Sequence, residues 1–272
     1  MRAVKAKKFL GQHFLTDLAT ARRIADTVDV RPDLPVLEVG PGMGVMTQYL
    51  VQKPRTLKVV EIDYESVDYL RHTYPDLEDS IIEDDFLKMH LENTFGGAPF
   101  VLTGNYPYNI SSQIFFKMLD YRDLIPVCTG MIQKEMAERL VAKPGTKAYG
   151  ILSVLIQAWY SVEYLFTVEP NVFNPPPKVR SAVVRLTRND VGNLGCDHRL
   201  FRRVVKTTFN QRRKTLRNNL RPLLAELDAE AGVAGDHSAF LANPQFDLRS
   251  ERLTVQQFVD LTNAVQQEVQ AK

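Results

Sequence analysis

Strand-like apolar segments alternate with helical segments along the first half of the chain, and this alternation limits the fold more than any other feature. Strands are predicted at residues 35–40, 57–63, 80–83, 99–104 and 125–132. Apolar residues at helical spacing predict helices at residues 16–30, 46–52, 64–74, 111–120, 134–142 and 150–160. Strands joined through helices form a largely parallel sheet whose two faces are covered. The predicted fold class is therefore α/β, with a mostly parallel, doubly wound sheet.

The later part of the chain has a different character. Two β-rich segments are predicted at residues 161–168 and 181–188, and the three prolines between them exclude a helix or a central strand there. The polar run at residues 188–197 is interpreted as a linker. We therefore expect two domains, an α/β domain over residues 1–190 and a small helical domain over residues 191–272.

The small domain carries its own helix signals. Helices are predicted at residues 199–209 and 211–224. The last helix is expected to begin at a capping box formed by Thr254 and Gln257.

Positive charge is concentrated in one part of the chain. Residues 178–221 hold thirteen Lys and Arg against two Asp and Glu, although the formal net charge of the whole chain is only +2. A smaller basic cluster lies near the N-terminus, at Arg2, Lys5, Lys7 and Lys8. Segregated positive charge points to a polyanionic partner such as nucleic acid, whereas the alternative is an ordinary solvated helix face.

The rest of the composition excludes several classes of protein. No apolar run approaches the ~18 residues of a membrane span, and the basic N-terminus lacks the apolar segment of a secretory signal. The two cysteines form no CxxC pattern and the five histidines are scattered, so neither a zinc ribbon nor another metal site is expected. These features predict a protein of the reducing cytoplasm without membrane attachment.

The segment VLEVGPGMG at residues 36–44 places three glycines directly after the first strong strand. Glycine lets the backbone turn sharply and approach a ligand closely, although a plain tight turn would use the same residues. At the end of the next strand, Glu61 is placed to accept hydrogen bonds from both ribose hydroxyls of an adenosine-containing ligand. Asp63 could take that part instead, but it is better placed to cap the following helix.

Asp85 follows the third strand and would lie at the same edge of the sheet as Glu61. An acidic side chain there suits the amino group of an adenine, and Ile62 and Phe86 could hold the adenine ring between them. Either apolar residue taken alone is more often part of a core. Together with the glycines, these residues predict an adenosine-binding crevice at the ends of three successive strands.

The stretch NYPY at residues 105–108 stands where the apolar strand PFVLTG ends. Pro107 fixes its own φ and biases Tyr106 toward an extended conformation, so the Tyr106 carbonyl and the Asn105 side-chain oxygen can point to one side. Two acceptors beside the ring of Tyr108 suit a planar base with an exocyclic amine. An ordinary turn would tolerate Asn-x-Pro but has no use for Tyr108.

The motifs GPGMG, VEID, DDF and NYPY follow one another in the order found in S-adenosylmethionine-dependent methyltransferases that modify adenine, which the chain resembles. With KKFLGQHFL, FNPPPKVRSAVVRL and FNQRRKTLRNNL, it closely resembles the small-subunit ribosomal RNA adenine N6-dimethyltransferases of the KsgA type. NxPY alone is not specific, because DNA adenine methyltransferases share it, whereas RRKTLRNNL is specific. The resemblance covers nearly the whole chain and implies a Rossmann-like methyltransferase domain followed by a small α-helical domain.

The resemblance also implies an activity: dimethylation of two adjacent adenosines near the 3′ end of 16S ribosomal RNA, with S-adenosylmethionine as methyl donor. The implied partner is small-subunit ribosomal RNA, expected within a partly assembled 30S subunit, and nothing demands more than a monomer. The implied cofactor contacts are His13, Leu15, Gly40, Gly42, Glu61, Ile62, Asp85, Phe86 and Asn105. The residues implied to meet the target adenine are Asn105, Pro107, Tyr108 and Phe173.

Folded RNA is expected to contact the basic block of the small domain through its phosphates. The candidate RNA-binding residues are Arg202, Arg203, Lys206, Arg212, Arg213, Lys214 and Arg217. Some of these arginines could brace the domain interface instead. The chain departs from the family at Tyr106, where Leu is usual, and at Arg180, where an acidic residue is usual.

Three other functions share parts of this pattern. A NAD-dependent oxidoreductase would use the glycine turn and Glu61, but it has no use for NYPY or for a basic helical domain. A non-catalytic assembly or transcription factor would keep the fold and the basic face. A large-subunit ribosomal RNA adenine methyltransferase of the macrolide-resistance type would share almost every motif.

Overall fold

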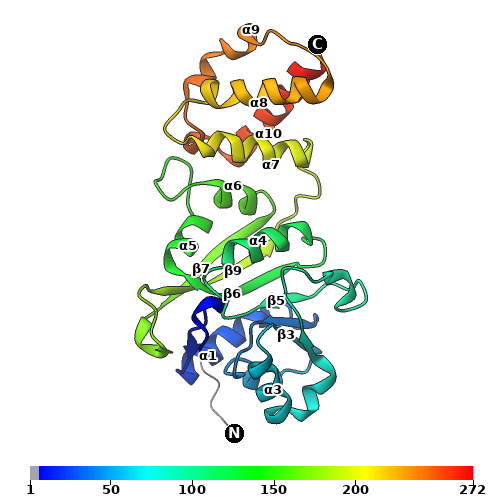
Figure 1. Ribbon diagram of the computed structural model, residues 1–272, viewed down its shortest axis with the longest axis vertical. Coiled ribbons are helices and arrows are strands. Elements are labelled where there is room, and N and C mark those ends of the chain that lie inside the picture. Colours follow the sequence, from blue (N-terminus) through cyan, green and yellow to red (C-terminus); the bar gives the residue numbers. More distant parts are fainter. Residues whose placement is uncertain (1–5, 272) are drawn as a thin grey trace. The chain divides into compact units, whose positions relative to one another are not determined.

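The computed structural model describes residues 6–271, so the basic residues Arg2 and Lys5 lie outside the described part. The chain forms two compact units (Figure 1). The first unit runs up to Glu138 and resumes over Tyr160–Asn189, and the second comprises Arg139–Trp159 and the chain from Asp190 onward. The second unit thus includes a segment that the sequence placed in the first domain. The division into domains at residue 190 stays a prediction.

A sheet of seven described strands dominates the first unit, in the order β4-β3-β2-β5-β6-β9-β7. The strands are β2 (Val36–Val39), β3 (Leu57–Glu61), β4 (Ile81–Glu83), β5 (Val101–Thr103), β6 (Val127–Gln133), β7 (Tyr160–Val168) and β9 (Ser181–Arg188). β4, β3, β2, β5 and β6 are parallel, whereas β9 is antiparallel to both β6 and β7. A separate antiparallel pair joins β1 (Phe14–Leu15) to β8 (Phe173–Asn174). The predicted α/β class with a mostly parallel sheet is confirmed.

Helices connect the parallel strands, as the alternation predicts. α2 (Thr47–Leu50), α3 (Tyr64–Thr73) and α4 (Ser111–Asp120) lie between parallel strands, whereas α1 (Leu18–Ala25) precedes β2 and α5 (Lys134–Leu140) follows β6. Short 3₁₀ helices occur at Lys8–Leu10, Asp26–Val30, Pro75–Ser80, Leu91–Asn93 and Pro170–Val172. Asp17 caps α1 by accepting from the Thr20 amide at 2.7 Å, so the predicted helix 16–30 starts after Asp17 and tightens to 3₁₀ at Asp26.

The continuous apolar runs of the parallel strands are explained by burial on both faces. All residues of β2 and β5 are buried, and so are the first six residues of β6. Val36, Val59, Val101 and Val127 from four neighbouring strands meet in one core cluster with helix residues such as Leu70. This core fixes the strands, so the loops at their carboxyl ends are held at one edge of the sheet.

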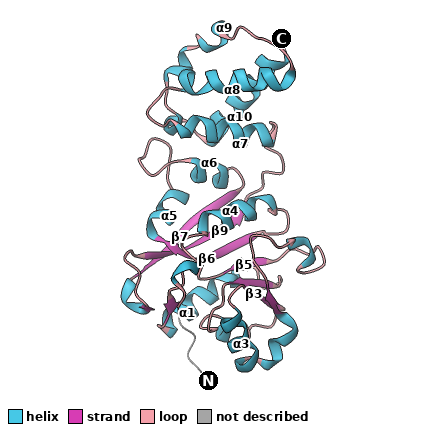
Figure 2. Cartoon of the chain, viewed as in Figure 1, coloured by secondary structure: helices cyan, strands magenta, loops and turns pink. Residues whose placement is uncertain are grey.

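The second unit is built from helices in its described residues, as the colouring of Figure 2 shows. These are α6 (Ile151–Gln157), α7 (His198–Asn210), α8 (Leu216–Ala231), α9 (Ser238–Leu241) and α10 (Val255–Gln270), with 3₁₀ turns at Pro244–Asp247 and Ser250–Arg252. The predicted capping box of the last helix is present, because Thr254 Oγ1 accepts from the Gln257 amide and Gln257 Oε1 accepts from the Thr254 amide. No helix among residues 6–271 is both long and apolar enough to cross a membrane.

Candidate functional site

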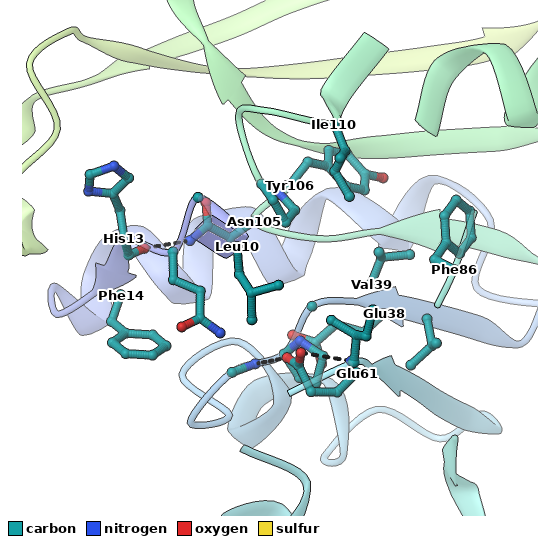
Figure 3. A pocket seen from close by; sticks show the side chains of 18 of the residues that line it. Leu10, His13, Phe14, Glu38, Val39, Glu61, Phe86, Asn105, Tyr106 and Ile110 are labelled. Carbon is teal, nitrogen blue, oxygen red and sulfur yellow. Dashed lines mark hydrogen bonds between the residues drawn. The ribbon is translucent and has the colours of Figure 1, made fainter. Parts of the chain in front are cut away.

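A pocket of about 230 Å³ opens at the carboxyl edge of the parallel strands (Figure 3). Its lining comes from the glycine turn after β2, the end of β3, the loop after β4 and the NYPY loop after β5, together with residues 10–15 of the N-terminal segment. The structure therefore brings together the motifs that the sequence analysis singled out. Of the predicted cofactor residues, all nine line this pocket, namely His13, Leu15, Gly40, Gly42, Glu61, Ile62, Asp85, Phe86 and Asn105.

The glycine turn is shaped by its neighbours as well as by its own conformation. Gly42 has φ +55°, and a Cβ there would come 3.0 Å from the ring of Phe14. A side chain at this position would strain the backbone and press on that ring. In this turn the buried Gly42 amide donates to the Glu61 carboxylate at the end of β3.

Glu61 ties the glycine turn to the end of β3. Its carboxylate accepts hydrogen bonds from the amides of Gly42 at 3.0 Å, Ile62 at 2.9 Å and Asp63 at 3.0 Å. Burial raises the pKa of Glu61, while these three amide donors oppose the rise. Glu61 is thus a fixed, largely buried acceptor that lines the pocket.

Asp63 is fully occupied by other partners. It caps α3 through the Glu65 amide, accepts from Ser66, and binds Gln12 and the Lys7 ammonium. Asp63 does not line the pocket. Its predicted role as a helix cap is confirmed, and Glu61 is the one of these two carboxylates that lines the pocket.

Asp85 and Phe86 lie in the loop after β4. The Asp85 carboxylate accepts from the Leu87 amide at 3.0 Å, which closes a turn around Phe86. Phe86 is largely buried, whereas Ile62 on the neighbouring strand end is half exposed, and both line the pocket. An acidic group and two apolar side chains from adjacent strand ends therefore surround one part of the pocket.

Asn105 is oriented by the N-terminal segment. Its Nδ2 donates to the carbonyl oxygen of His13 at 3.2 Å (Figure 3). An amide whose nitrogen is used in this way presents its oxygen as an acceptor. His13 in turn bonds through Nδ1 to the carbonyl oxygen of Pro175 at 2.8 Å. The N-terminal segment is thus hydrogen-bonded to the NYPY loop and to the loop that contains Pro175.

Tyr106, where the resemblance led us to expect Leu, is turned into the core. Its ring is buried, and its hydroxyl donates to the Thr129 carbonyl at 2.9 Å. A Cβ at Gly104 or Gly130 would come 3.1 Å or 2.7 Å from this ring, so two glycines make the space for it. The Tyr106 amide donates to the Met131 carbonyl at 3.0 Å, which fixes the NYPY backbone against β6. The larger side chain thus points into the core, and the loop backbone stays at the pocket.

Phe173 is not brought to the pocket. It is 4% exposed and packs with Leu15, Ile24, Met131 and Val183 in a core cluster. The pairing of β8 with β1 holds it there. Pro107 and Tyr108, the other predicted contacts of the target base, do line the pocket.

Glu38 is a pocket residue that the sequence analysis missed. It lies within β2, is 1% exposed, and accepts a hydrogen bond from Thr47 Oγ1 at 2.7 Å. Burial raises its pKa to about 8, and the nearby Glu61 carboxylate adds to the rise while the Thr47 bond opposes it. A charged residue inside the apolar run VLEV was a signal that could have identified it.

The seven candidate RNA-binding residues of the second unit divide into three groups. Arg203 pairs with Glu226 and Glu230, Arg212 with Glu251, and Arg217 with Asp247, so these three brace the unit internally. Arg213 and Lys214, in the turn between α7 and α8, are exposed. The remaining two candidates, Arg202 and Lys206, lie on α7.

Solved structures place the fold among known enzymes. A dimethyladenosine transferase from Plasmodium falciparum matches with a TM-score of 0.77 at 23% identity, over 94% of this chain and 98% of that chain. The 23S rRNA methyltransferase ErmE matches with a TM-score of 0.61 at 28% identity, over 93% of this chain and 99% of that chain. The fold is that of the Rossmann-like methyltransferases.

The sequence comparisons identify the family within the Rossmann-like methyltransferases to which the chain belongs. The model of the family described as ribosomal RNA adenine dimethylase matches residues 3–242, and the chain belongs to that family. The ribosomal RNA small subunit methyltransferase A of Bacteroides fragilis is 67% identical over 267 residues, which cover 98% of this chain and 94% of that protein. The predicted family is thereby confirmed, and the oxidoreductase alternative is disfavoured.

Proposed function

We propose that this protein transfers methyl groups from S-adenosylmethionine to N6 of two adjacent adenosines near the 3′ end of 16S ribosomal RNA, dimethylating both. The similarity to a small-subunit methyltransferase at 67% identity supports this substrate over the large-subunit alternative. We further propose that the enzyme works as a cytoplasmic monomer on a partly assembled small subunit.

The pocket suits the proposed cofactor by its donor and acceptor chemistry. Glu61 offers a buried carboxylate for ribose hydroxyls, and Asp85 offers a partly exposed carboxylate for an adenine amine. Phe86 and Ile62 supply apolar surface for the ring, and the Gly42 turn leaves room where a Cβ would meet Phe14. When bound, S-adenosylmethionine supplies an electrophilic methyl group on a positively charged sulfur.

The observation that carries the proposal is the orientation of Asn105. Because the His13 carbonyl holds its Nδ2, the Oδ1 atom is the one that can accept an N–H from an adenine amine. The Tyr106 carbonyl, from the same loop, is the second acceptor in this proposal. Two such acceptors align the amine and stabilise the positive charge that develops on its nitrogen during transfer. A strong base is not needed, because a methylated ammonium on an adenine is acidic enough to lose its proton to water.

The target adenosine must leave its stack before it can reach this pocket. Tyr108 is proposed to offer its ring as the replacement stacking surface. Phe173 is given no part in this step, because its ring lies in the core.

The first experiment maps the modified nucleotide. Small subunits that lack the modification are incubated with the protein and labelled S-adenosylmethionine, and the methylated residues are located by mass spectrometry of RNA fragments. We expect dimethylation of two adjacent adenosines near the 3′ end of 16S RNA. Label confined to large-subunit RNA would favour the macrolide-resistance type of activity, and no label in either RNA would favour a non-catalytic RNA-binding protein.

The second experiment tests Asn105. Asn105→Ala is expected to keep S-adenosylmethionine binding in calorimetry but to slow single-turnover methyl transfer by about 10²-fold or more, as for loss of one preorganised polar group. Asn109→Ala is the matched control, since Asn109 lines the same pocket from the same loop, but its Nδ2 donates to the Phe9 carbonyl instead of the His13 carbonyl. Unchanged transfer by Asn105→Ala would remove this residue from the mechanism.

A further inference from the structure

The loop that carries Asp85 and Phe86 is fixed only partly by its own hydrogen bonds. The amides of Lys88 and Met89 donate to the Asp85 carbonyl at 2.8 Å and 3.1 Å, and the Leu87 amide donates to the Asp85 side chain. These bonds close one turn. They leave the carbonyls of Leu87 and Met89 without a partner from within the loop, although backbone acceptors near a core need one.

Lys117 of α4 supplies that partner. Its ammonium donates to the Leu87 carbonyl at 3.0 Å and to the Met89 carbonyl at 2.5 Å. One half-buried side chain thus ties the far end of the loop to a helix that is anchored in the core by Ile114, Phe115 and Met118.

The same ammonium also lies against Phe86. Lys117 Nζ is 5.6 Å from the centre of the Phe86 ring and 5.4 Å from that of Tyr121. Cations at this distance are attracted to an aromatic face. Phe86 therefore lies near the Lys117 ammonium and also lines the pocket.

The Lys117 ammonium is partly removed from water. Burial lowers the pKa of Lys117, while the carboxylates of Asp85, Glu92, Asp120 and Asp84 oppose that shift. An ammonium that is partly removed from water depends more on its protein partners than an exposed one. Lys117 has no role in the methyl-transfer chemistry proposed above.

We propose that Lys117 is a positioning residue for the methyl donor: it holds the loop so that Asp85 and Phe86 stand ready for an adenine ring. This inference rests on the proposed function, because it presumes that the pocket binds S-adenosylmethionine. It predicts that losing Lys117 weakens cofactor binding and leaves the transfer step itself intact.

Lys58 provides a matched control within the same chain. It lies on β3, donates to the Thr94 carbonyl at 2.8 Å, and stands 5.5 Å from the centre of the Phe95 ring. It thus makes the same kinds of contact as Lys117 to a different loop. Neither Lys58 nor Thr94 nor Phe95 lines the pocket.

The test compares Lys117→Met with Lys58→Met, since methionine keeps an apolar stem but has no donor. Binding of S-adenosylhomocysteine is measured by calorimetry, and methyl transfer to small subunits by steady-state kinetics. Lys117→Met is expected to raise the Kd for S-adenosylhomocysteine and the KM for S-adenosylmethionine about tenfold each. The kcat at saturating cofactor should stay within about twofold, whereas Lys58→Met should leave all three constants near those of the wild type. Lys117→Arg, which keeps a charge and several donors, should restore most of the affinity.

A double mutant distinguishes positioning of Phe86 by Lys117 from a general loss of structural order. In a Phe86→Leu background, adding Lys117→Met should weaken binding by a smaller factor than it does in the wild-type protein, because the effects of residues in contact are not additive. Equal affinity of Lys117→Met and wild type, or equal weakening by Lys58→Met, would overturn the inference while the proposed function stands. A wild-type protein that binds neither S-adenosylmethionine nor S-adenosylhomocysteine would refute the proposed function and this inference with it. Thermal unfolding of each variant shows whether it is folded. If Lys117→Met is unfolded, Lys117→Arg is compared with the wild type in its place.

Discussion

The imidazole of His13 is stacked on the ring of Tyr108, with ring centres 5.5 Å apart and planes inclined by 28°. The Tyr108 hydroxyl is bonded to Ser181 Oγ, so the ring is held from its edge as well as from one face. In the proposed function, the target base would stack on the opposite face of this ring or take the place of His13. In both cases the aromatic surface of Tyr108 matters more than its hydroxyl.

Substitutions at Tyr108 should separate its ring from its hydroxyl. Tyr108→Phe keeps the stacking surface and is expected to retain kcat/KM for small subunits within about fivefold, since one hydrogen bond contributes roughly 1 kcal/mol. Tyr108→Ala loses a stacking partner that contributes about 1–3 kcal/mol per base, which lowers kcat/KM by about 5- to 150-fold. Equal activity of the two variants would mean that no base stacks on this ring.

Glu38 should make the stability of the protein depend on pH. Its pKa is about 8 in the folded protein against an ordinary value of 4.5, because burial disfavours the charged form. Between these values the folded state holds a proton that the unfolded chain has released, so stability falls as the pH rises from about 4.5 to about 8. Glu38→Gln should remove this component and unfold at higher denaturant concentration than wild type at pH 8.

Denaturant unfolding at pH 5 and pH 8 checks this expectation. The difference between Glu38→Gln and wild type should be larger at pH 8. Glu83→Gln, which changes an exposed carboxylate at the end of β4, serves as the control and should show little effect at either pH. A Glu38→Gln protein whose stability follows the wild-type pH profile would show that Glu38 is ionised at neutral pH.

The second unit contains a group with the same sign of pH dependence for a different reason. His237 is 8% exposed, with Nε2 at 2.9 Å from Asp228 and Nδ1 at 2.8 Å from Glu268. Both ring nitrogens can donate only when the imidazole is protonated. Burial lowers its pKa, but the two hydrogen bonds and the charges of Glu268 and Asp228 outweigh this and raise the pKa above 6.5.

This network is expected to stabilise the protein fully below pH 6.5 and to lose its contribution as the pH rises through the folded pKa. His237→Gln cannot carry the positive charge, so it should be less stable than wild type at pH 6 by about 1–3 kcal/mol. The difference should shrink at pH 9, as measured by denaturant unfolding at both pH values. A difference that is constant with pH would show that the folded protein holds His237 neutral.

Sequence patterns correctly predicted the features that depend on residues close together in the chain, such as strand ends and helix caps. The end of each apolar run marked the edge of the sheet, and Gly42, Glu61, Asp85 and Asn105 therefore met in one pocket as expected. Asp63 could be assigned to a helix cap because the capped helix follows it directly.

Features that depend on distant partners could not be predicted. Phe173 is buried because β8 pairs with β1, more than 150 residues earlier in the chain. The predicted helix 150–160 ends at Gln157 because Tyr160 pairs with Arg188 in the sheet. Likewise, the apolar spacing of residues 211–224 did not reveal that α8 begins at Leu216, after a turn that separates it from α7.

The sequence also could not show which residues of the basic block have carboxylate partners. From sequence alone, seven cations on neighbouring segments were equivalent candidates for RNA contact. The structure distinguishes Arg203, whose two carboxylate partners lie 2.7 Å and 3.0 Å away on α8, from the exposed Arg213 and Lys214. An arginine held between carboxylates has less charge to offer a phosphate, so the exposed pair is the better RNA-binding candidate.

Neutralising that pair should weaken RNA binding in a salt-dependent way. Arg213→Gln with Lys214→Gln is expected to lower the affinity for small subunits at low salt and to reduce the slope of log affinity against log salt by about 2, or roughly one per lost phosphate contact. Arg203→Gln is the control: it should lower unfolding stability by about 1 kcal/mol, through loss of a partly exposed ion pair, and leave the salt slope unchanged. Filter-binding titrations between low and moderate salt measure the slopes. The opposite result would be an unchanged slope for the double variant and a reduced slope for Arg203→Gln. It would place the RNA on α7, which carries Arg203, Arg202 and Lys206, instead of on the turn.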